Sequence, residues 1–159
     1  MNRLPPLTKQ GLYDPQFERD ACGVGVGASI GGVKSHDIIK KGLEVLVNLS
    51  HRGARGADPE TGDGAGLLLQ MPHQFFGREC AKLGFTLPEP GQYGVGMVFL
   101  PMEAAQRRRC EEIFEEIVAE EGQTVLGWRD VPVDNSQIGT GARQVEPCIR
   151  QLFIGRGPD

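Results

Sequence analysis

Apolar and polar positions follow two alternating periods along this chain. Every second residue is apolar from Val24 to Ile30, which predicts a strand over 22–30. An apolar stripe at three- and four-residue spacing predicts a helix over Asp37–Ser50. The same two periods predict further strands at 64–71, 93–100, 124–133 and 148–154 and further helices at 72–83 and 103–121. The order of elements is therefore strand, helix, strand, helix, strand, helix, strand and strand.

The side-chain pattern also predicts how these elements pack. Glycines at 23, 25 and 27 leave one face of the first strand bare, so backbone or ligand can approach closely. Gly42 costs about 1 kcal/mol relative to alanine inside a helix, and therefore indicates close packing there. The residues expected to face inward from the second and third helices are Phe75, Phe76, Cys80, Ile113, Phe114, Ile117 and Val118.

Composition narrows the classes of function. The chain has 159 residues, 24% of them charged, and a net charge of −4, which is typical of a globular domain and argues against a nucleic-acid surface. The basic run Arg107–Arg109 precedes four glutamates at helical spacing, which indicates an ion-paired face. No apolar run reaches the ~20 residues of a membrane span. Residues 1–21 lack the apolar segment of a secretory signal, so a cytoplasmic location is expected.

The four cysteines are at positions 22, 80, 110 and 148. They form no CxxC pair and have no clustered histidines, so the sequence predicts neither a metal site nor a disulfide framework. Cys80, Cys110 and Cys148 are expected to be small buried apolar residues.

Cys22 has a different context, because it follows Asp20-Ala21 and begins a run of small residues. If the bond after Ala21 were cut, Cys22 would carry both a thiol and a free α-amine, whose unperturbed pKa is ~8. That amine could accept the thiol proton and later deliver it to a leaving amine. A core cysteine at the start of a strand is the structural alternative.

Three further motifs have two interpretations each. Gly23-x-Gly25-x-x-Ala28 fits a dinucleotide fingerprint, but Gly31-Gly32 stands where the fingerprint needs a helix. His51-Arg52-Gly53 is explained by a cation and a glycine at a helix C-terminus, or by an Arg52 turned toward a substrate carboxylate or reaction intermediate. The run Thr61–Gly66 is either a tight turn or a loop against which a ligand lies.

Taken in order, these motifs resemble the start of a class II glutamine amidotransferase. They are Asp20-Ala21-Cys22-Gly23-Val24-Gly25, His51-Arg52-Gly53-Ala54 and Thr61-Gly62-Asp63-Gly64-Ala65-Gly66. The length of the segment between Gly53 and Gly64 resembles the glutamate synthase type of this family. So do the runs Gly91–Pro101 and Gly127–Ser136.

The resemblance implies an α+β fold, namely an αββα sandwich of the N-terminal-nucleophile (Ntn) hydrolase type, incomplete because only its N-terminal part is expected here. It implies a leader over 1–21, removed after Ala21, and a partial amidotransferase domain over 22–159. It also implies glutaminase chemistry on L-glutamine, with Cys22 as the nucleophile and Arg52 and Gly53 at substrate-binding positions.

The resemblance implies no cofactor within this segment. FMN and an iron–sulfur cluster are implied for a synthase region expected beyond Asp159, together with an electron-donating small subunit. The oxyanion Asn-Gly pair of the family is also expected beyond this segment. Two alternatives remain open, namely an inactive module that depends on a partner and another class II amidotransferase.

Overall fold

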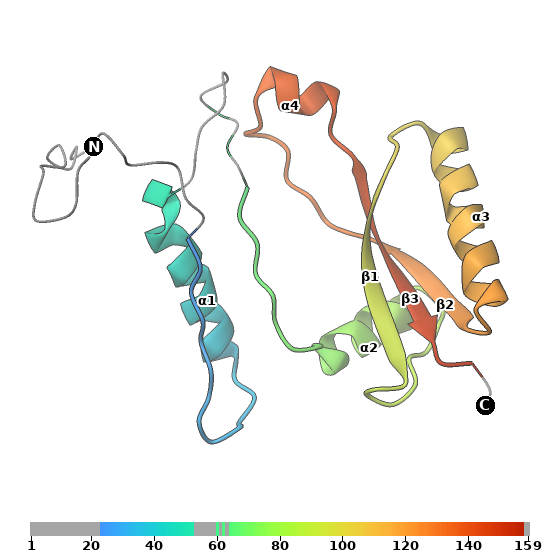
Figure 1. Cartoon of the computed structure of the whole chain (residues 1–159), viewed down its shortest axis with the longest axis horizontal. Coiled ribbons are helices and arrows are strands. Elements are labelled where there is room, and N and C mark those ends of the chain that lie inside the picture. Colours follow the sequence, from blue (N-terminus) through green and yellow to red (C-terminus); the bar gives the residue numbers. More distant parts are fainter. Residues whose placement is uncertain (1–22, 53–59, 61, 63, 158–159) are drawn as a thin grey trace, which may run out of the picture. The chain divides into compact units, whose positions relative to one another are not determined.

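A computed structural model describes residues 23–52, 60, 62 and 64–157 of the chain. The chain divides into two compact units, residues 1–68 and residues 69–159. Figure 1 labels the helices and strands of both. Cys22 and Gly53 lie outside the described residues, and only the backbone of Arg52 is described.

The first unit is built around helix α1, His36–Asn48. Ser35 is its N-cap, because the Ser35 hydroxyl accepts a hydrogen bond from the Asp37 N–H at 3.1 Å. A short 3-10 helix, η2, follows at Ser50–Arg52. The predicted helix is therefore confirmed, with a separate last turn.

The predicted strands at 22–30 and 64–71 are wrong for the residues that the structure describes. Residues 23–29 and 64–70 have no strand assignment, and the ladder-forming strands begin at Tyr93. An alternating sequence becomes a strand only when a neighbouring strand takes up its backbone hydrogen bonds. Both segments instead approach α1, 23–29 at the Val45 side chain and 64–70 at Gly42.

The second unit contains a three-stranded antiparallel sheet in the order β1-β3-β2. Its strands are β1 (Tyr93–Leu100), β2 (Thr124–Asp130) and β3 (Cys148–Gly155), close to the predicted positions. Since β3 pairs antiparallel with both neighbours, β1 and β2 run parallel on either side of it. A bulge between Val125 and Gly127 interrupts the β2 ladder.

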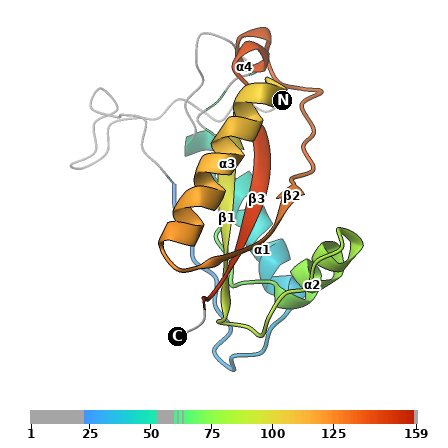
Figure 2. The ribbon, with the colours of Figure 1, turned by 90° about the vertical axis from the view of Figure 1, so that its right-hand side faces the viewer.

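Three helices accompany the sheet. They are α2 (His73–Lys82), α3 (Ala104–Glu120) and α4 (Thr140–Gln144). The first two were predicted, whereas the five-residue α4 was not. Helix α3 connects β1 to β2 and lies along the sheet (Figure 2). Its N-cap is Glu103, whose carboxylate accepts from the N–H groups of Ala105 and Gln106 at 2.9 and 2.8 Å.

The core of the second unit lies between α2 and one face of the sheet. Its buried members are Phe76, Cys80, Tyr93 and Phe153. The Phe76 and Phe153 rings meet edge to face, with 5.2 Å between their centroids. The predicted inward positions of Phe76 and Cys80 are confirmed, but Phe75 is 42% exposed.

The inward face predicted for α3 is only partly right. Val118 is buried, but Ile113 and Ile117 are 40% and 50% exposed. The face against the sheet instead includes Glu111, which pairs with Arg150 of β3. A partly buried ion pair replaces the expected apolar contact there, because the strand brings a charged side chain beneath the helix.

Candidate functional site

Helix α1 has contacts with the segments that flank all three candidate motifs. Built on Gly23, a Cβ atom would lie 2.9 Å from Leu49 Cδ2. A Cβ on Gly42 would lie 2.9 Å from Leu67 Cδ1, and a Cβ on Gly25 would overlap Val45 Cγ1. The chain therefore uses glycine where backbone and side chain approach most closely.

The contacted positions of α1 share one face. Gly42, Val45 and Leu49 are spaced by three and four residues, which places them on one side of a helix. The segment that follows Cys22 and the segment that follows the Gly62–Gly66 loop both reach this side. The close approach predicted for Gly23, Gly25 and Gly42 is confirmed, whereas a Cβ on Gly27 would have no atom within 4 Å.

The C-terminal end of α1 leads directly into the motif His51-Arg52-Gly53. Leu49 is the C-cap, and its N–H donates to Val45 O at 2.9 Å. His51 Nδ1 lies 2.8 Å from the carbonyl oxygen of Asn48. Since a carbonyl can only accept, Nδ1 donates this bond and carries the proton.

The glycine-rich loop is described only in part, because Thr61 and Asp63 are outside the described residues. Gly64 has φ +85°, a left-handed conformation that favours glycine. From Gly64 the chain continues without a helix or strand to Leu67, whose side chain meets Gly42. No helix follows Gly23–Ala28 before His36, so the dinucleotide fingerprint is not satisfied.

The second unit contains charged clusters that the sequence reasoning missed. On one face of the sheet, Arg150 pairs with Glu111 and, at 2.7 Å, with Asp130. Burial lowers the pKa of Arg150, but the hydrogen bond that Arg150 donates to Glu111 and the nearby acidic charges outweigh it and raise the pKa. The only sequence signal was a charge inside an otherwise apolar strand.

The opposite face of the sheet has a second arginine. Arg129 Nη1 donates to Gln151 Oε1 at 2.9 Å, and Arg129 Nη2 lies 3.5 Å from Glu79 Oε2. Both arginines are held by protein acceptors, so these clusters support the packing of helices onto the sheet. We assign them no catalytic role.

The described cysteines are free thiols. Cys80 is fully buried, and burial raises the pKa of its thiol, which makes it a poor nucleophile. Its prediction as a buried apolar residue is confirmed, whereas Cys110 and Cys148 are only half-buried. Across the described part of the chain, no three His, Cys, Asp or Glu side chains gather as a metal site would require. No helix among these residues is long and apolar enough to cross a membrane.

Comparison with known proteins identifies the class. Residues 22–159 match the family model of class II glutamine amidotransferases. The chain therefore belongs to this family, and it is an enzyme domain with a mixed α and β fold.

Its relatives belong to the glutamate synthase type. The chain is 49% identical over 158 residues, 99% of its length, to the glutamate synthase [NADPH] large chain of Bacillus subtilis. It is 44% identical over 91% of its length to the glutamate synthase [NADH] of Schizosaccharomyces pombe, and 39% identical over 86% to ferredoxin-dependent glutamate synthase 2 of Synechocystis. These matches cover 10%, 7% and 9% of the respective relatives, so the chain spans about a tenth of their length or less.

Proposed function

We propose that this chain carries the glutaminase part of a glutamate synthase, with Cys22 as an N-terminal nucleophile. The observation that carries the proposal is the convergence on α1. The segments flanking Cys22, Arg52 and the Gly62–Gly66 loop all meet one helix, most of them on a single face. The family match begins at residue 22, which supports a boundary between a leader over 1–21 and the domain.

In this mechanism the α-amine of Cys22 takes the thiol proton, and the thiolate attacks the side-chain amide carbon of glutamine. The resulting tetrahedral oxyanion collapses, the C–N bond breaks, and the α-amine returns the proton to the departing ammonia. Water then hydrolyses the thioester and releases glutamate. Arg52 and Gly53 shape the pocket that holds the glutamine.

We also propose that the complete domain is an αββα sandwich. The incompletely covered face of the sheet supports this proposal. Helix α2 packs over one end of the face that contains Phe153. Toward the other end of the same face, Met97 and Phe99 of β1 are 52% and 65% exposed. A second sheet packed on this face would bury them.

The synthase steps belong to the remainder of a longer protein. The proposal assigns the iron–sulfur cluster and FMN to that region and not to this segment. The ammonia would be used there to aminate 2-oxoglutarate. A small electron-donating subunit and a cytoplasmic location are part of the same proposal.

The test uses the whole glutamate synthase. Cys22→Ala should abolish glutamate formation from glutamine while leaving formation from added ammonia intact, because only the release of ammonia needs the thiolate. Cys110→Ala, which changes a half-buried cysteine on α3, is the matched control and should leave both activities unchanged. Glutamine-dependent turnover by Cys22→Ala would overturn the proposal.

A second candidate is a module that acts only beside its partner, and the exposure of α1 favours it. None of the 13 residues of α1 is buried. A glutaminase assay on the 159-residue chain alone distinguishes the two ideas, since measurable turnover would refute the partner-dependent module.

A further inference from the structure

His51 makes a contact that the proposed chemistry does not use. Its ring donates from Nδ1 to the carbonyl oxygen of Asn48 at 2.8 Å, three residues back along the chain. The last four carbonyl groups of an α-helix have no partner within the helix, and Asn48 is the last residue of α1. His51 therefore supplies a hydrogen bond that the helix cannot.

This hydrogen bond holds the backbone at a specific place. Ser50, His51 and Arg52 form the single turn η2, which is too short to be stable by itself. With its ring attached to the end of α1, His51 fixes the direction in which the chain leaves the helix. Arg52 follows His51 in the sequence, so its backbone takes that direction.

The same end of α1 receives the segment that follows Cys22. Leu49 lies between Asn48 and η2, and its methyl groups approach Gly23 so closely that a Cβ atom there would be 2.9 Å away. Two successive residues at this end of the helix thus have one contact each. Asn48 accepts the hydrogen bond from His51, and the Leu49 side chain packs against Gly23. Cys22 is bonded to Gly23, and Arg52 to His51.

We propose that His51 is a positioning residue for the glutaminase reaction. Its Nδ1–H bond to the Asn48 carbonyl holds the Arg52 backbone at the helix end that also contacts Gly23, the residue that follows Cys22 in the sequence. The inference rests on the proposed function, because it assigns His51 a role in the reaction of Cys22.

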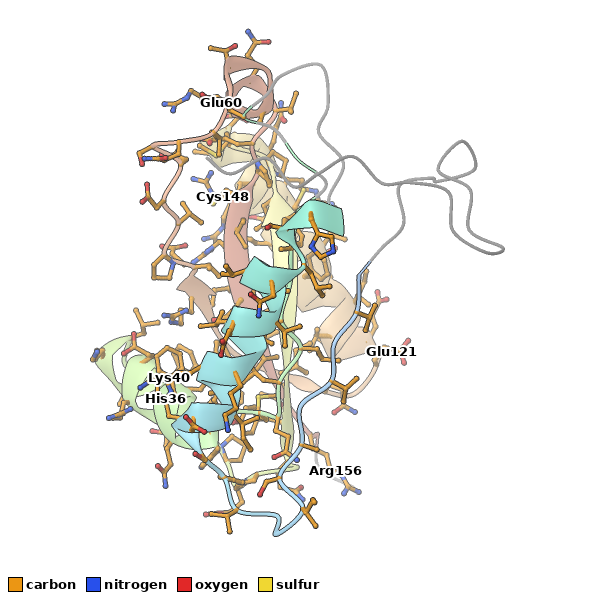
Figure 3. All side chains as sticks on the ribbon, turned by 90° about the vertical axis from the view of Figure 1, so that its left-hand side faces the viewer. His36, Lys40, Glu60, Glu121, Cys148 and Arg156 are labelled. Atoms are coloured by element: carbon orange, nitrogen blue, oxygen red, sulfur yellow. The ribbon has the colours of Figure 1, made fainter. Side chains whose placement is uncertain are left out.

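Two substitutions separate the hydrogen bond from the rest of the ring. In His51→Asn, the amide nitrogen is attached at the same atom as Nδ1 and can donate to the Asn48 carbonyl. In His51→Gln, the amide nitrogen lies one bond further out, at the position of Nε2. His36→Ala is the matched control, because His36 is the first residue of α1, at the opposite end of the helix (Figure 3).

The experiment measures glutamine-dependent and ammonia-dependent turnover of these variants and of His51→Ala in the whole glutamate synthase. Cys22→Ala is measured beside them. His51→Ala and His51→Gln should lower kcat/KM for glutamine on the order of five- to tenfold, the effect of one hydrogen bond. His51→Asn should restore most of that loss, His36→Ala should match the unaltered enzyme, and ammonia-dependent turnover should not change.

The outcomes are distinguishable from failure of the proposed function. If Cys22→Ala abolishes glutamine use while His51→Ala retains the unaltered kcat/KM, the positioning role is refuted and the nucleophile stands. Equal losses in His51→Asn and His51→Gln would also refute it, because the Nδ1 donor would then not matter. A parallel loss of ammonia-dependent turnover would show a general folding defect and overturn the inference.

Discussion

The two units of this chain differ in how far they bury their own apolar residues. The second unit has a closed core, in which Phe153 has no exposed surface and Cys80 is fully covered. In the first unit, α1 buries none of its residues, and Val47 of its apolar stripe is 70% exposed. The motifs for chemistry belong to the first unit, whose helix has no buried residue, whereas the second unit buries its own core.

This difference follows from the physical chemistry of the two parts. A sheet with helices on it pairs its strands and covers part of its apolar face within one stretch of chain. A helix flanked by two unpaired segments does neither. The first unit therefore depends on packing that its own described residues do not supply.

The largest effect should come from the core of the second unit. Phe153→Ala should lower the free energy of unfolding by about 3–5 kcal/mol, because a fully buried ring leaves a cavity between Phe76 and Phe85. Phe99→Ala is the matched change on the sheet, at a side chain that is 65% exposed, and should cost much less. Similar midpoints for both variants in urea denaturation would remove the distinction between core and uncovered face.

The ion pair beneath α3 should come next. Glu111→Gln should cost about 2–3 kcal/mol, because it leaves Arg150 partly buried with one acidic partner fewer. Glu112→Gln, on the same helix but 41% exposed, should cost no more than about 0.5 kcal/mol. Equal losses in thermal unfolding would contradict the assignment of Arg150 to the packing of this unit.

A smaller effect is expected at the contacts of α1. Gly25→Ala should destabilise the first unit by about 1–2 kcal/mol, because its Cβ would overlap Val45. Gly27→Ala should be tolerated, since a Cβ there would meet no atom within 4 Å. Hydrogen exchange of the α1 amides in the whole protein checks this, and faster exchange in both variants alike would speak against the contact.

The smallest effect concerns pH. Hydrogen bonds from the N–H groups of Ala105 and Gln106 lower the pKa of Glu103 below its usual value of 4.5. A lowered folded-state pKa contributes stability above the unfolded-state pKa and loses it as pH falls through the lower value. Glu103→Gln should therefore flatten the acid side of the stability–pH curve below about pH 5. An unchanged slope would mean that this cap does not titrate with folding.

The sequence predicted the elements whose signal is local. The apolar stripe of α1 and the alternation in β1 and β3 lie within single stretches of chain, so their positions were correct to within a few residues. Segments 23–29 and 64–70 have the same local signal but no strand beside them. Pairing partners are a property of the whole fold, which local alternation does not contain.

The sequence predicted which motifs form the candidate site, but it did not predict the contacts that their neighbouring residues make. Nothing in the sequence near His51 indicates that its ring binds back to Asn48, since the same residues also fit a simple helix end. Glu111 and Arg150 are 39 positions apart, so only the fold brings them together. Cys22, Arg52 and Gly53 remain predictions about chemistry.

The most direct test of the central claim is the N-terminus of the active enzyme. The intact mass and terminal sequence of a glutamate synthase that uses glutamine should show a chain beginning at Cys22, because only then does this residue have a free α-amine. An active, glutamine-using enzyme that still has residues 1–21 attached would contradict the mechanism.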